Sequence, residues 1–126
     1  MDDYIRLVRK ELEKKADIIN FVQLEWETSL SIKKGTLKGK VVFLDGSILH
    51  INEFVSDRTK RYRFHYMDSG NNLIRRWDSS PHHKGLNTFP YHLHKEDKAL
   101  PSPPVTLIHV LRCIEEIVLE SFKRSK

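Results

Sequence analysis

The chain has 126 residues, of which 39% are apolar and 31% charged, a length and composition that fit one domain with a packed core. No stretch approaches the roughly 20 apolar residues of a bilayer-spanning helix, and the acidic start lacks the apolar segment of a secretory signal, so we expect neither. Twenty-two basic residues against seventeen acidic ones give a net charge of +5, which suits an anionic partner.

The first predicted element is an amphipathic helix near the N-terminus. One face of it carries apolar residues at helical spacing, namely Ile5, Val8, Leu12 and Ala16. The opposite face carries charged residues. From residue 20 the apolar period changes to two, which is typical of strands. We therefore expect a packing helix followed by a sheet.

Five strands are predicted in succession, joined by short polar turns. Asp45-Gly46 gives the strongest hairpin signal, because these residue types favour the tight turns between antiparallel strands. The predicted strands cover residues 20–27, 36–44, 48–55, 61–66 and 73–78. No crossover long enough for a parallel pair interrupts them, so an antiparallel meander is expected.

Residues 79–104 fit no regular element. They hold all five prolines and four of the seven histidines. We expect a long ordered loop, or a loop with one short strand around residues 89–94. A final helix follows, with Ser102 as its N-cap and an apolar face from Leu107 to Phe122. The single cysteine, Cys113, lies off that face and indicates a reducing, cytoplasmic setting.

These elements predict one α+β domain over residues 1–126. Its antiparallel meander sheet of about five or six strands carries the N-terminal and C-terminal helices on one face. The other face, with the histidine-rich loop folded across it, is expected to carry the functional site.

Four histidines and an aspartate near the loop are candidates for acid–base chemistry: His82, His83, His92, His94 and Asp78. Histidine changes protonation near neutral pH, so it serves as general acid, general base or metal ligand. Three imidazoles, or two with Asp78, would hold a metal with one position open to water. The simpler alternative is that the histidines pack the loop and bond its backbone.

Arginines on the predicted sheet are candidates for phosphate binding. Arg61, Arg63 and His65 share one face of their strand, and Arg75 or Arg76 would lie beside them on the next strand. Arginines on a rigid sheet bind phosphate and stabilise charge that develops at phosphorus. Nearby histidines would then move protons at a ribose 2′-hydroxyl and a leaving 5′-oxygen, which cleaves RNA without a metal.

Two further charged groups have simpler interpretations. Glu53 is an alternative base. The simpler interpretation is that Glu53 faces solvent or forms an ion pair with an arginine. The lysines of the second strand, Lys38 and Lys40 among them, are expected to form a solvated edge that discourages aggregation. They would extend a nucleic-acid footprint if RNA is the ligand.

Four short motifs resemble the TumE family, small toxins of toxin–antitoxin pairs. They are residues 62–66 (YRFHY), 76–78 (RWD), 81–83 (PHH) and 89–94 (FPYHLH), and the final helix agrees in position and length. Ser79 stands where the family pattern has asparagine, and Lys84 where proline is common, but neither departure removes a titratable group. The resemblance implies a growth-inhibiting protein that a helix-turn-helix antitoxin, encoded beside it, neutralises.

The predicted function is therefore an RNA-targeting toxin that acts as a metal-independent endoribonuclease. In this prediction Arg63 and Arg76 bind phosphate, His82 and His92 exchange protons, and Asp78 orients an imidazole, while His65, His83 and His94 have no assigned role. The alternatives are a binding module without catalysis and a phosphoesterase with a divalent metal at the histidines. Expected partners are RNA and the antitoxin, with no membrane; a homodimer is left open.

Overall fold

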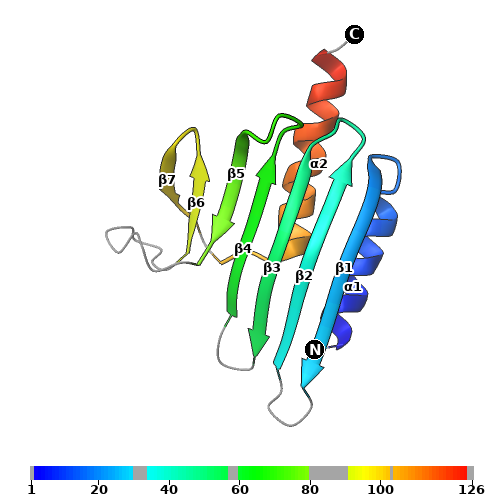
Figure 1. Ribbon diagram of the computed structural model, residues 1–126, viewed down its shortest axis with the longest axis vertical. Helices are drawn as coiled ribbons and strands as arrows, with labels where there is room; N and C mark the ends of the chain where they lie inside the picture. The colour runs from blue at the N-terminus through cyan, green and yellow to red at the C-terminus, as the bar shows by residue number, and fades with distance from the viewer. Residues whose placement is uncertain (1, 30–33, 57–59, 80–90, 103, 125–126) are drawn as a thin grey trace.

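A computed structural model of the chain describes residues 2–29, 34–56, 60–79, 91–102 and 104–124 (Figure 1). Within these ranges the chain forms two helices and one antiparallel sheet of seven strands. The elements are α1 (Asp2–Lys14), β1 (Ile19–Ser29), β2 (Lys34–Phe43), β3 (Ile48–Ser56), β4 (Lys60–Met67), β5 (Leu73–Asp78), β6 (His92–Lys95), β7 (Lys98–Pro101) and α2 (Leu107–Arg124). The strands are neighbours in chain order, so the predicted α+β meander is confirmed, with more strands than predicted.

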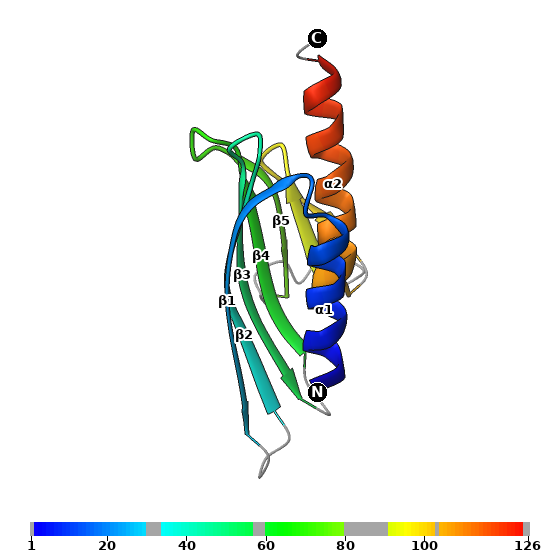
Figure 2. The same cartoon turned by 90° about the vertical axis from the view of Figure 1, so that its right-hand side faces the viewer.

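The molecule has two layers, because both helices lie along the same side of the curved sheet (Figures 1 and 2). The hydrophobic core fills the space between them, and its largest buried side chains include Phe43, Phe64 and Tyr66. We call the other side of the sheet the open face, because no described helix covers it. No helix of the described ranges is long and apolar enough to span a membrane.

Strand alternation decides which side chains face the helices. On β4, Tyr62 and Phe64 are buried, whereas Arg61 and Arg63 are exposed. Successive strand residues point to opposite faces, so burial of the aromatic set places the basic set on the open face. The predicted separation of these two sets is confirmed.

The hairpin predicted at Asp45-Gly46 joins β2 to β3. Gly46 has a φ of 86°, which favours glycine, and its amide donates to the carbonyl oxygen of Phe43 at 3.0 Å. The Asp45 carboxylate accepts from the amide of Ser47 at 3.0 Å. This turn fixes the register between the two strands.

The segment 79–104 differs from the prediction, because it contains two strands where at most one was expected. β6 and β7 form a hairpin through Glu96 and Asp97, whose φ angles are 53° and 61°. Such paired positive angles are usual in two-residue hairpin turns, but they are commonly supplied by asparagine and glycine. The sequence signal was therefore weak, and residues 80–90 lie outside the described ranges.

The C-terminal helix begins later than predicted. Its first residue is Leu107, and the hydroxyl of Thr106 accepts a hydrogen bond from the amide of His109 at 3.3 Å. Thr106 is thus the N-cap, since its side chain satisfies an amide of the first turn. Ser102 is buried in the segment before the helix and does not begin it.

Candidate functional site

The register of the sheet arranges the open face in parallel cross-strand rows. The apolar row runs through Phe21, Val42, Ile48, Met67 and Leu73. The histidine row runs through Gln23, Lys40, His50, His65, Arg76 and His94. The arginine row runs through Glu25, Lys38, Asn52, Arg63 and Asp78, with the backbone of His92 in register beyond it. Five cationic or titratable side chains therefore stand side by side in the histidine row.

A compact cluster forms where these rows cross β5 and β6. The Asp78 side chain is 2% exposed, and its Oδ2 lies 3.1 Å from Nε of Arg76 and 3.4 Å from Nε2 of His94. Nη2 of Arg76 lies 3.2 Å from the same imidazole nitrogen. The buried carboxylate is thus compensated by two basic side chains of the adjacent row.

The partner of His94 depends on its protonation. Because arginine only donates, Nε2 of His94 accepts from Arg76 when that nitrogen lacks a proton. When the imidazole is protonated, it forms an ion pair with the Asp78 carboxylate, whose Oδ2 lies 3.4 Å from Nε2. The imidazole therefore has a polar partner in both states: Arg76 when it is neutral and Asp78 when it is charged.

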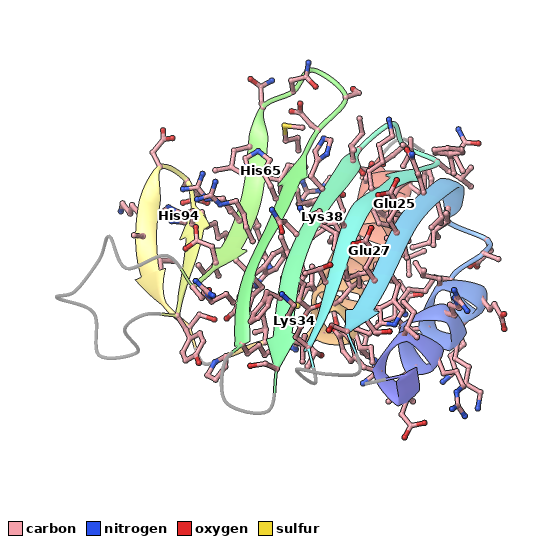
Figure 3. All side chains as sticks on the ribbon, turned by 60° about the horizontal axis from the view of Figure 1, so that its bottom comes forward. Glu25, Glu27, Lys34, Lys38, His65 and His94 are labelled. Atoms are coloured by element: carbon pink, nitrogen blue, oxygen red, sulfur yellow. The ribbon has the colours of Figure 1, made fainter. Side chains whose placement is uncertain are left out.

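His65 occupies the centre of the histidine row and favours the neutral form. Burial lowers the pKa of His65 below its ordinary value, and the positive charge of Arg76 lowers it further, followed by His50 and Arg63. A neutral imidazole at neutral pH can accept a proton. Figure 3 shows His65 and His94 on β4 and β6, with β5 between them.

Basic side chains surround this cluster on the open face. Arg63 is exposed and pairs across the sheet with Asp78, while Arg61 is exposed with its guanidinium carbon 5.2 Å from the ring centroid of Phe54. Lys38 lies further along the arginine row, opposite Glu25 (Figure 3). A field of cations with exposed arginines can bind an anionic chain.

Two predicted site residues lie on the helix-covered side and away from the cluster. Arg75 pairs with the buried Tyr66 on that side and lies near Cys113; burial raises the pKa of the thiol, and the charge of Arg75 opposes this increase. Glu53 is 1% exposed, and its carboxylate oxygens accept from the Tyr4 hydroxyl at 2.7 and 2.9 Å. Burial raises the pKa of Glu53, which faces neither solvent nor an arginine of the described ranges; its charged partner is Lys60, whose Nζ lies 4.0 Å from the carboxylate.

Three predicted histidines carry no side-chain description. His82 and His83 lie outside the described residues, and for His92 the structure gives the backbone, which pairs with Asp78. Among the side chains that are described, no group of three histidine, cysteine, aspartate or glutamate residues is arranged to hold a metal. The metal alternative also involves these three histidines, so it stays a prediction to be tested in solution.

His50 and Asn52 belong to the site rows, but the sequence analysis did not single them out. Both lie on the open face of β3, opposite Lys40 and Lys38. The available signal was the hairpin at residues 45–46, because counting outward from that turn pairs these residues. Alternation along β3 would then have placed their side chains with those of Arg63 and His65.

Comparison with known proteins adds one finding. A family model described as Toxin TumE matches residues 8–121, which include all seven strands and most of both helices. No curated protein and no solved structure matches the chain significantly. The matched range contains all three rows and the cluster at Asp78.

Proposed function

The chain belongs to the TumE family of toxins from toxin–antitoxin systems, and from this premise we propose that it acts by cleaving RNA on the open face of its sheet. The observation that carries the proposal is the row in which His65, Arg76 and His94 lie next to one another on three adjacent strands. Their environments suit different tasks, because His65 favours its neutral form and His94 lies beside a buried carboxylate.

The proposed reaction transfers two protons. His65 removes the proton of a ribose 2′-hydroxyl, and the 2′-oxygen forms a bond to the adjacent phosphorus. The bond between phosphorus and the 5′-oxygen breaks, and the imidazolium of His94 gives its proton to that oxygen. The products are a 2′,3′-cyclic phosphate and a 5′-hydroxyl, and no metal or redox partner is needed.

Arginines would stabilise the charge that develops at phosphorus. Arg63 is exposed beside the cluster, and Arg76 lies between the two histidines. Guanidinium groups bind phosphate oxygens through two parallel hydrogen bonds and keep their charge at any relevant pH. Asp78 would hold the imidazolium of His94 through the contact at 3.4 Å.

The test is cleavage of a labelled single-stranded RNA by the purified full-length protein in EDTA. We expect wild-type cleavage to persist and His65→Gln or His94→Gln to lower the rate about 100- to 10,000-fold, the usual range for a general acid or base. His109→Gln is the matched control, since this exposed histidine lies on α2, away from the open face. Undiminished cleavage by both site variants would contradict the proposal.

The same assay separates the alternatives. Cleavage that EDTA abolishes and zinc or manganese restores would assign a metal-dependent phosphoesterase. Intact RNA in both conditions, with binding that weakens steeply as salt rises, would assign a binding module without catalysis. His82→Gln and His92→Gln test the proton-exchange roles that the sequence predicts for these residues.

An antitoxin partner follows from the toxin family. We propose that this partner is a helix-turn-helix protein encoded beside the toxin and that the toxin acts on cytoplasmic RNA. Co-expression should restore growth that the toxin alone stops. Growth inhibition that the neighbouring gene product leaves unchanged would argue against that partner.

A further inference from the structure

A second feature of the open face lies beside the cluster at Asp78, where β5 ends. A pocket of about 330 Å³ is lined by side chains from three strands, and we call it the Phe54 pocket. Its lining includes Asn52, Phe54, Arg61, Arg63 and Asp78. The pocket therefore shares Asn52, Arg63 and Asp78 with the arginine row.

Phe54 is an unusual residue for this position. Among the described open-face positions of β2 to β5, it is the only phenylalanine, tyrosine or tryptophan. It is half-buried beside Arg61 and does not belong to the core between sheet and helices. Because the Phe54 ring lies on the charged face, it adds nothing to that core. A role in ligand binding explains its position better than a structural role does.

The side chains around the ring suit a nucleobase. The guanidinium of Arg61 lies over Phe54 at 5.2 Å, which forms a flat platform of the kind on which unpaired bases stack. The amide of Asn52 is exposed at the pocket wall and offers both a donor and an acceptor to a base edge. We propose that the Phe54 pocket binds a base of single-stranded RNA, which gives the proposed nuclease a base preference.

The distance along β4 places the base in the Phe54 pocket on a nucleotide beside the cleaved bond and not on the nucleotide that is cleaved. Arg61 and His65 lie on the same face four residues apart, about 13 Å at 3.3 Å per strand residue. Arg63 lies between them, where it would contact the intervening phosphate. The bound base thus belongs to a neighbouring nucleotide, and the inference rests on the proposed function for its ligand, single-stranded RNA.

The test measures binding without cleavage. The probe is a fluorescein-labelled 2′-O-methyl RNA heptamer, whose blocked 2′-oxygens cannot attack phosphorus, compared with the same backbone lacking its bases. The full-length wild type should bind the base-bearing probe more tightly than the abasic one. Phe54→Ala should weaken binding of the base-bearing probe about 5- to 100-fold, the usual effect of losing a stacking platform. The abasic probe should bind both proteins equally.

Further variants keep this test specific. Phe21→Ala removes another exposed phenylalanine of the open face, in the apolar row, and should leave both affinities unchanged. Phe54→Trp should retain stacking and restore the preference for bases. Asn52→Ala should change which of four homopolymeric probes binds most tightly, because the edge contact is lost. Thermal unfolding of each variant verifies that it is folded.

The outcomes separate this inference from the proposed function. Equal wild-type affinity for base-bearing and abasic probes, or an unchanged affinity in Phe54→Ala, would overturn the pocket even if RNA is cleaved. Base-dependent binding that Phe54→Ala removes would support the pocket even if the wild type cleaves nothing. Failure of the wild type to bind either probe would overturn the pocket as well.

Discussion

At the residue scale, the two histidines on either side of Arg76 in the histidine row have different surroundings. His65 faces Arg76 and Arg63, whose charges add to burial in lowering its pKa. His94 contacts both Arg76 and the Asp78 carboxylate through the same nitrogen. This difference is why the proposed mechanism assigns them opposite halves of a proton transfer.

A titration tests this electrostatic assignment directly. The pKa of His65 should lie below its ordinary value of 6.5 in the wild type. Arg76→Gln removes the charge that most strongly disfavours the imidazolium, so the pKa of His65 should rise. NMR titration of the His65 ring protons measures both values without requiring activity.

The pH dependence of the cleavage rate should follow the ionisation of His65. If His65 is the base, cleavage increases as this residue loses its proton, so the acidic limb of kcat/KM should lie below pH 6.5 in the wild type and should move to higher pH in Arg76→Gln. Lys10→Gln, on the exposed face of α1, is the control for a general loss of charge. A His65 titration that Arg76→Gln leaves unchanged would remove the physical basis for its role as base.

At the scale of elements, a buried ion cluster joins the two helices. The ammonium of Lys15, just after α1, lies 2.7 Å from Glu11 and 3.4 Å from Glu115 of α2. The side chains of Lys15 and Glu11 are 5% and 6% exposed, whereas that of Arg112, which also contacts Glu11, is 65% exposed. The helices that support the sheet are thus connected by charge as well as by apolar packing.

Removing one charge of this cluster should destabilise the fold. Glu11→Gln leaves the buried Lys15 less compensated and should lower the free energy of unfolding by about 3 kcal/mol. Arg112→Ala, at the exposed end, should cost no more than about 1 kcal/mol. Urea unfolding at neutral pH measures both changes.

The pH dependence of this effect has a definite sign. The hydrogen bond from Lys15 lowers the pKa of Glu11 below 4.5, so its contribution is present above that pH and is lost as the pH falls through the lowered value. The difference between wild type and Glu11→Gln should therefore shrink in acid. A difference that grows below pH 4.5 would show that the cluster does not act through the carboxylate.

Much of the element order could be predicted from local patterns, whereas the failures depend on strand register and on the assembly of distant elements. Alternation on β4 predicted the faces of Tyr62 and Arg63, because one face of the strand is buried. Whether Arg75 or Arg76 joins the site depends on register, and an irregularity after Tyr66 shifts the pairing with β5. No pattern within β5 reveals that shift.

The surroundings of Glu53 were also beyond sequence reasoning. Its hydrogen-bond partner, Tyr4, lies 49 residues away and on α1. The same hydroxyl accepts a hydrogen bond from the amide of Leu107 at the start of α2 at 3.2 Å. Burial of a carboxylate in such a network depends on how three elements assemble, which composition and periodicity do not determine.

At the scale of the whole molecule, the two faces of the sheet differ in composition and in role. One face buries the core against both helices, and the other presents cations in ordered rows. The net charge of +5 would attract an anionic chain in general. The rows would orient that chain across the strands. In the proposed function, the histidine row would transfer protons at the place where that chain lies.

The most direct measurement of the central claim is the chemistry of the RNA ends. We predict that wild-type protein in EDTA produces 2′,3′-cyclic phosphate and 5′-hydroxyl ends, detected by mass spectrometry of a short RNA. The same RNA with a single 2′-deoxy nucleotide at the cleaved position should remain intact, because the attacking oxygen is absent. Ends with a 5′-phosphate, or cleavage of the deoxy-substituted strand, would contradict an acid–base mechanism at His65 and His94.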